Sequence, residues 1–142
     1  MVKDGVVLKR RIRLPSTNAE AVVVSINRPD QLNCFNTQVC HQLAQVFREL
    51  QNDDDNSLVA VIFTGEGTSF CAGADLSNPP NPLEASSDLE HDLVNNPVHQ
   101  MRKLRVPLIA ALKGYVSVLV CVAKVRYPPV QLTVQSRLSV LD

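Results

Sequence analysis

The chain has 142 residues, of which 45% are hydrophobic and 20% are charged, so it fits one globular domain and wholesale disorder is excluded. Fourteen basic and fourteen acidic side chains cancel, and two tyrosines without any tryptophan offer little for base stacking. We therefore expect no nucleic-acid partner.

The cysteines and the apolar runs exclude further classes of protein. Four cysteines, at 34, 40, 71 and 121, form no CxxC pair and have no histidine at ligand spacing, so we expect no metal site. No apolar run reaches the roughly 20 residues that a membrane span needs. We expect a soluble, intracellular protein with free thiols, and the cytoplasm, the mitochondrion and the peroxisome stay open as its compartment.

The N-terminal half predicts two strands and a helix. Residues 6–14 alternate loosely between apolar and basic side chains, which is typical of an outer strand, and AVVVSI (21–26) indicates a more buried one. The NRPDQLN segment (27–33) has turn chemistry. Asn36 can then cap a helix that runs to about Leu50. Its apolar stripe follows helical spacing and consists of Val39, Leu43, Val46, Phe47 and Leu50.

The second half continues the alternation of strands and helices. LVAVIFT (58–64) predicts a third strand, SNPPNPLEASS (77–87) a Pro-rich loop, and PLIAAL (107–112) a fourth, buried strand. Between them we expect a helix over 87–105, which Pro97 should kink or split. Its inward positions would be Leu89, Leu93, Val98, Met101 and Leu104. This order of elements indicates α/β architecture.

The stretch TSFCAGADLS (68–77) follows the third strand with few long side chains. Small residues beside a glycine let a ligand approach the main chain itself. We interpret the stretch as a loop that binds through peptide N–H and C=O groups. The alternative is a tight loop whose small residues merely fit under a neighbouring helix.

Three ordered blocks, NRPDQLN, VIFTGEGTSFCAGADL and VPLIAALKGY, lie between Val22 and Tyr115. Together they resemble the enoyl-CoA hydratase/isomerase (crotonase) superfamily of acyl-CoA metabolism. The resemblance implies an α/β, crotonase-like ββα spiral, incomplete because only its N-terminal part is present. It also implies acyl-CoA as the partner, with the coenzyme A thioester as substrate and no separate cofactor. Crotonase-family subunits, as a homo- or hetero-oligomer, are further expected partners.

The resemblance also implies which groups bind the ligand. By its place in the motif, the Ala74 N–H is similar to one donor of an oxyanion hole, and Gly73 would bring it forward. The carbonyls of Ala72 and Ala74 and the backbone of Leu76 are similar to those that receive the adenine of CoA. Arg28 would approach phosphate or be a solvated surface charge. Asp75 would touch ligand or cap the next turn, and we prefer the cap.

The family pattern stops after Tyr115, so we expect a core over 1–115 and a divergent tail over 116–142. Val118, Leu119 and Val120 stand where the family has glycines, Val122 stands where its first acid falls, and no glutamate follows Glu90. Hydration of an enoyl thioester needs a base and an acid. We therefore expect a family protein that is catalytically impaired. The alternative is a non-catalytic acyl-CoA-binding remnant or an assembly subunit of intact homologues. The change at Tyr115 points to a truncated or alternatively spliced product, or to a gene model read past a boundary.

Overall fold

The computed structural model of the chain describes residues 5–54, 56–77, 93–116 and 131–134. Its strands form one five-stranded sheet in the order β1-β2-β3-β4-β5. β1 pairs antiparallel with β2, and each later pair is parallel. The bounds of the strands are Val7–Arg13 (β1), Glu20–Ile26 (β2), Leu58–Gly65 (β3), Leu108–Leu112 (β4) and Gln131–Val134 (β5).

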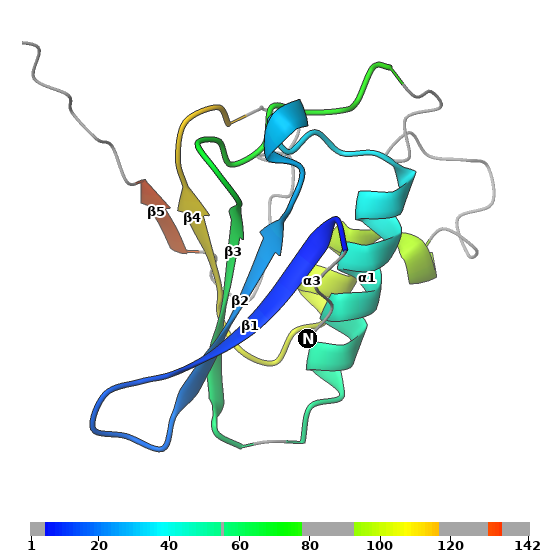
Figure 1. Cartoon of the computed structure of the whole chain (residues 1–142). Coiled ribbons are helices and arrows are strands. Elements are labelled where there is room, and N and C mark those ends of the chain that lie inside the picture. The colour runs from blue at the N-terminus through cyan, green and yellow to red at the C-terminus, as the bar shows by residue number, and fades with distance from the viewer. Residues whose placement is uncertain (1–4, 55, 78–92, 117–130, 135–142) are drawn as a thin grey trace, which may run out of the picture.

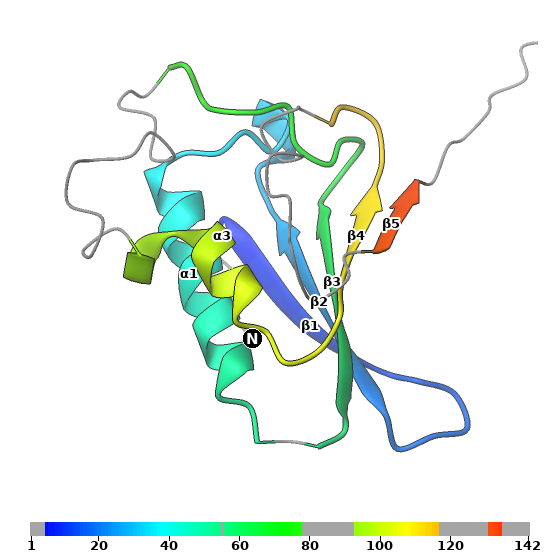
Figure 2. The same cartoon turned by 180° about the vertical axis from the view of Figure 1, so that it is seen from behind.

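Two α-helices, α1 (Thr37–Gln51) and α3 (Pro97–Arg102), lie on one side of the sheet, as Figures 1 and 2 show from opposite directions. A 3-10 turn, η1, covers Pro29–Gln31. The Asn36 side chain accepts a hydrogen bond of 2.9 Å from the Val39 N–H. The predicted helix start is therefore confirmed, with one of the unpaired first-turn donors satisfied.

The core lies between α1 and the sheet face that carries alternate residues of β2 and β3. Val22, Val24 and Ile26 of β2 are fully buried there, and Val61 and Phe63 lie opposite them on β3. All five apolar positions predicted for α1 contribute, with Val46 partly buried and the others buried. The Phe63 ring meets Phe47 of α1 edge-on at 6.0 Å and Phe70 edge-on at 5.3 Å. Phe70 thus anchors the chain beyond β3 to the core.

All four predicted strands and the first helix are confirmed, but the predicted second helix is wrong in extent. Helical residues 93–95 are followed by Asn96 in an extended conformation, and α3 begins at Pro97. The split at Pro97 is as predicted, because proline lacks an N–H and disfavours a helical residue before it. The helix ends at Arg102 instead of 105, before the chain turns toward β4.

Two details of that region also differ from the expectation. Leu93 was expected to face inward but is 37% exposed, since it lies before the break at Asn96. β5 was not predicted at all. Most of the expected Pro-rich loop (77–87) and the expected inward Leu89 fall outside the described residues.

The carboxyl ends of β2 and β3 meet at one edge of the sheet, where Ile26 pairs with Gly65. Two segments leave the strands there, residues 27–35 after β2 and residues 66–77 after β3. Crevices at the carboxyl ends of parallel strands are the usual place for ligands in α/β sheets. The segment that carries Arg28 and the stretch interpreted from the sequence as a binding loop therefore start from the same edge.

Candidate functional site

The loop after β3 is held on two sides by other parts of the backbone. On the β4 side, the N–H groups of Phe70 and Cys71 donate to the carbonyls of Lys113 (2.7 Å) and Tyr115 (3.0 Å). These bonds extend the alignment of β3 and β4 past the ends of the strands. The start of the loop is therefore an extension of the sheet.

On the other side, the loop pairs with the segment that follows β2. The Ala72 N–H donates to the Leu32 carbonyl at 3.0 Å, and the Asp75 N–H donates to the Phe35 carbonyl at 2.7 Å. The Phe35 N–H in turn donates to the Gly73 carbonyl at 2.8 Å. Phe35 and Ala74 are thereby partners in a parallel bridge.

Gly73 and Cys71 form the turn in the middle of the loop. Gly73 has φ +115°, which side chains rarely tolerate and glycine adopts readily. Its N–H donates to the Cys71 sulfur at 3.4 Å. Burial raises the pKa of the Cys71 thiol to about 11, so the sulfur is a neutral acceptor at physiological pH.

Ala74 has a different position in this pattern from its neighbours. From residue 70 to residue 75, it is the one whose N–H makes no hydrogen bond within the described residues. In this parallel bridge Phe35 bonds through its own N–H and C=O to the two residues that flank Ala74, so the N–H and C=O of Ala74 itself point the other way. The Ala74 N–H is therefore directed away from Phe35. The Ala72 and Ala74 carbonyls likewise accept no hydrogen bond from the described residues.

Arg28 and Asp75 connect the two segments through their side chains. The Arg28 guanidinium donates to Asp75 Oδ2 at 2.9 Å and to the Cys34 carbonyl at 2.7 Å. The side chains are only 13% and 11% exposed. The alternative that Arg28 is a solvated surface charge is therefore wrong, because the guanidinium is enclosed by its partners. Its contact with phosphate stays a prediction.

Asp75 caps the turn that follows it, as we preferred from the sequence. Its Oδ1 accepts hydrogen bonds from the Ser77 N–H at 3.1 Å and from the Ser77 hydroxyl at 2.5 Å. The bond from the Ser77 hydroxyl, and after it the bond from Arg28, lowers the pKa of the carboxyl group. Three donors to this carboxylate favour its ionised form, so it is poorly suited to act as a proton donor.

The remaining predicted positions differ in their surroundings. Leu76 is 92% exposed, so its side chain lies in solvent beyond the loop. Ala72 is partly buried and Gly73 is buried. Val118, Leu119, Val120 and Val122, which the resemblance predicts at the family's glycine and acid positions, fall outside the described residues. Roles in binding for Arg28, Ala72, Gly73, Ala74, Asp75 and Leu76 stay predictions.

Asn33 is the residue of this region that sequence reasoning missed. It is fully buried, and its side chain contacts the loop after β3. From the sequence it was counted only among the residues of a local turn. Polar residues in turns are usually exposed, so no feature of the sequence around Asn33 indicates that its side chain is buried.

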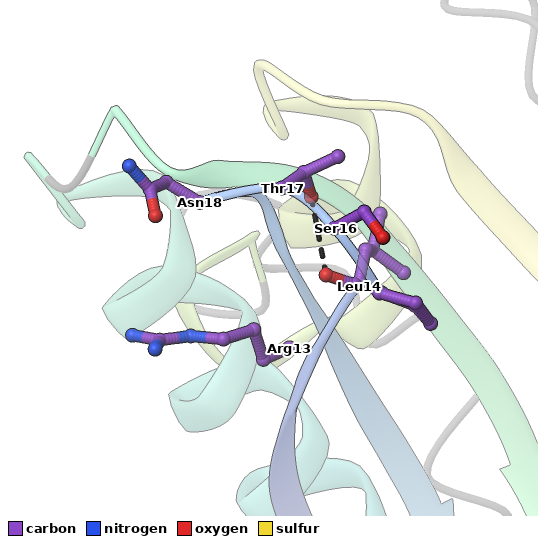
Figure 3. A pocket seen from close by; sticks show the side chains of 6 residues that line it. Arg13, Leu14, Ser16, Thr17 and Asn18 are labelled. Atoms are coloured by element: carbon purple, nitrogen blue, oxygen red, sulfur yellow. Dashed lines mark hydrogen bonds between the residues drawn. The ribbon is translucent and has the colours of Figure 1, made fainter.

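Two hollows lie away from this loop. One hollow, of about 500 Å³, lies at the β1–β2 turn and is lined by Arg13, Leu14, Pro15, Ser16, Thr17 and Asn18. Figure 3 shows these side chains from close by. Within this turn the Thr17 hydroxyl donates to the Leu14 carbonyl at 3.2 Å, the dashed line in Figure 3. One short turn supplies all the residues that line this hollow. Among the described residues, no side chain from a second element faces it, as a ligand site would require. The other hollow, of about 250 Å³, lies between the end of α1 and residues 105–106.

Over the residues that the structure describes, no three histidine, cysteine, aspartate or glutamate side chains gather as a metal site requires. None of the helices in these ranges has the length and apolar character needed to cross a bilayer.

Known proteins resemble the chain in sequence. A profile of the family described as enoyl-CoA hydratase/isomerase matches residues 16–119. The chain is 36% identical over 113 residues to the probable enoyl-CoA hydratase 1, peroxisomal, of Arabidopsis thaliana, which covers 79% of this chain and 40% of that protein. It is 32% identical over 97 residues to the 1,2-epoxyphenylacetyl-CoA isomerase of Escherichia coli, covering 66% and 36%.

The fold is similar as well. The crystal structure of an enoyl-CoA hydratase from Mycobacterium tuberculosis H37Rv matches with a TM-score of 0.55 and 31% identity, over 79% of this chain and 39% of that one. The chain thus spans about two fifths of the length of the relatives that it matches.

Proposed function

Because the chain belongs to the enoyl-CoA hydratase/isomerase family and has part of the crotonase fold, we propose that it binds an acyl-CoA thioester through the backbone of residues 70–76. The observation that carries the proposal is the Ala74 N–H. Its neighbours in the loop have hydrogen bonds that fix the backbone, while this donor has no partner among the residues that the structure describes.

The chemistry of a thioester suits such a donor. When a proton leaves the α-carbon, or when a nucleophile adds at the β-carbon, negative charge develops on the thioester oxygen. A fixed N–H that points at this oxygen lowers the barrier by about 3–4 kcal/mol. The rigid loop contributes because its donor needs no reorganisation when the charge appears.

Two carbonyls that accept no hydrogen bond from the described part of the chain offer a complementary role. The Ala72 and Ala74 carbonyls are acceptors, and the amino group of adenine is a donor that such acceptors recognise. The thioester and the adenine of the ligand would then both be recognised by backbone groups of residues 72–74. Arg28 is already paired with Asp75, so we assign phosphate contact a smaller part in the affinity.

We propose further that the 142-residue chain does not hydrate enoyl thioesters. Its sequence has valine or leucine at 118, 119, 120 and 122, so no carboxylate and no glycine-based second donor is supplied there. Loss of one oxyanion donor costs about 10²–10³ in rate, and loss of general acid–base help costs about 10²–10⁴.

The test of binding uses crotonyl-CoA and free CoA as matched ligands in titration calorimetry. Ala74→Pro removes the N–H, and Ala74→Ser keeps it. We expect Ala74→Pro to weaken binding of crotonyl-CoA about five- to tenfold, as loss of one hydrogen bond does, and to leave free CoA unchanged. Equal affinity of both variants for crotonyl-CoA would contradict the proposal.

The test of catalysis follows the absorbance of the enoyl thioester with the purified chain. We expect no turnover above a buffer control. Turnover above the control, if a bulky substitution of Gly73 abolishes it, would contradict this proposal. It would show that another acidic residue of the chain transfers the proton.

A further inference from the structure

The segment 27–35 contacts the binding loop through one side chain at its centre. Asn33 donates from Nδ2 to two carbonyls, Glu66 O and Ser69 O, both at 2.8 Å, and its Oδ1 accepts from the Arg28 N–H at 2.9 Å. Both amide protons are therefore used, and the amide joins the two ends of the 66–69 turn. Asn33 has no exposed surface.

The backbone at this point is in an unusual conformation. Leu32 has φ +48° and Asn33 has φ +56°, so two consecutive residues other than glycine are left-handed. Such residues are uncommon, and strain of this kind persists only where the surroundings determine it. Asparagine tolerates this region better than most residues, and here its side-chain bonds hold it there.

The left-handed pair has a direct consequence for the loop. It turns the chain so that the Leu32 carbonyl accepts from Ala72 and so that Phe35 pairs with Gly73 and Asp75. These are the bonds that leave the Ala74 N–H pointing away from Phe35. The direction of that donor therefore depends on the geometry at Asn33.

We propose that Asn33 is a positioning residue for the thioester-binding N–H of Ala74. It does not touch the ligand. Its amide fixes the 66–69 turn to the segment 32–35, and that segment fixes residues 72–75. The inference rests on the proposed function, because it assigns a residue to the geometry of the same donor.

The first test needs no ligand, so its failure is separate from failure of the binding proposal. Amide hydrogen exchange is measured by NMR for Asn33→Asp, which has the same size but no Nδ2 donor. We expect exchange of the Ala72 and Asp75 N–H groups to rise about tenfold or more, because their partners lie on the released segment. Amides of β2 and β3 should keep their protection.

The matched control is Asn36→Ala, which removes the side chain that caps α1 and leaves the loop bonds in place. Exchange in this variant should rise in the first turn of α1 and stay unchanged at Ala72 and Asp75. If Asn33→Asp does not fold, Asn33→Gly gives the same comparison, since glycine keeps the left-handed backbone and loses all three side-chain bonds.

The second test measures affinity for crotonyl-CoA relative to free CoA. A positioning role predicts that Asn33→Asp lowers this ratio about fivefold or more, in the direction of Ala74→Pro, while Asn36→Ala keeps the wild-type ratio. The proposal is overturned if a folded Asn33 variant keeps wild-type exchange at Ala72 and Asp75. It is also overturned if exchange rises uniformly over the sheet, because a uniform rise would mean that Asn33 stabilises the whole fold and has no specific effect on the loop.

Discussion

Replacing Gly65 by alanine should open the binding loop at its base. A Cβ at this position would lie 2.3 Å from the Phe70 carbonyl oxygen, 2.5 Å from the Ser69 carbonyl oxygen and 2.6 Å from Asn33 Nδ2. Two of these atoms belong to the backbone and the third to a fully buried amide, so none can swing aside. Gly65 is not among the residues with positive φ, and the cost of the substitution is therefore steric.

The magnitude follows from what must move. Fitting one extra carbon into a packed site costs about 1–3 kcal/mol. Separating Asn33 Nδ2 from the Glu66 and Ser69 carbonyls leaves buried polar groups unpaired, which adds about 1–3 kcal/mol. We expect a loss of about 2–6 kcal/mol, a large share of the roughly 5–15 kcal/mol that stabilises an ordinary domain.

The assay is urea unfolding followed by far-UV circular dichroism, with Gly67→Ala as the control. Gly67 has φ +74°, and a Cβ there would lie 3.0 Å from the Pro29 Cβ and 3.9 Å from the Pro29 Cα. Its left-handed backbone predicts a loss of about 1–2 kcal/mol. A Gly65→Ala variant within about 1 kcal/mol of the wild type, or a larger loss for Gly67→Ala, would refute this reasoning.

Three further predictions concern ionisation, thiol reactivity and association. The pKa of Asp75 is lowered from 3.8, so its carboxylate stabilises the fold above that pH and this stabilisation is lost as the pH falls through the folded-state pKa. Asp75→Asn should therefore lose less stability than the wild type as the pH falls. Acid unfolding curves with the same pH dependence for both proteins would contradict the prediction. Burial raises the pKa of Cys71 to about 11 and that of Cys40 to about 12, so iodoacetamide at about pH 8 should label neither thiol before urea is added. Peptide mass spectrometry that finds Cys71 labelled in the native chain would show an open loop. Leu76 and Tyr115 are 92% and 65% exposed, and exposed apolar surface favours association; sedimentation that shows a monodisperse monomer at high concentration would contradict this.

The sequence predicted the elements whose signals are local. Alternation along residues 6–14, the β-branched run at 21–26 and the helical stripe after Asn36 each repeat with the period of one kind of element. Burial of one face then follows from the same pattern, as Val39 and Leu43 show by being fully buried. The break at Pro97 was likewise local, because it follows from the missing N–H of proline.

The sequence could not predict what depends on contacts between distant residues. The role of Asn33 depends on carbonyls 33 and 36 residues further along the chain, and nothing next to Asn33 encodes them. Arg28 was left open between phosphate and solvent because its partner, Asp75, is 47 residues away. β5 pairs with β4, but its four residues show no pattern strong enough to predict a strand.

In the proposed function, binding and chemistry would depend on different parts of this polypeptide, so one could be lost without the other. The Ala74 N–H belongs to the backbone, and its direction depends on Asn33 and Gly73 and not on the side chain at 74. Proton transfer instead needs a carboxylate at a fixed place, and valine at 122 supplies none. A single glutamate introduced at 122 would restore only one proton-transfer group. By the resemblance, hydration would still lack a second acid, and Leu119 would stand where the family has the glycine that gives the second donor. If the proposed function holds, binding would follow the backbone of residues 70–76, while the chemistry would need acid–base groups that valine and leucine at 118–120 and 122 do not supply.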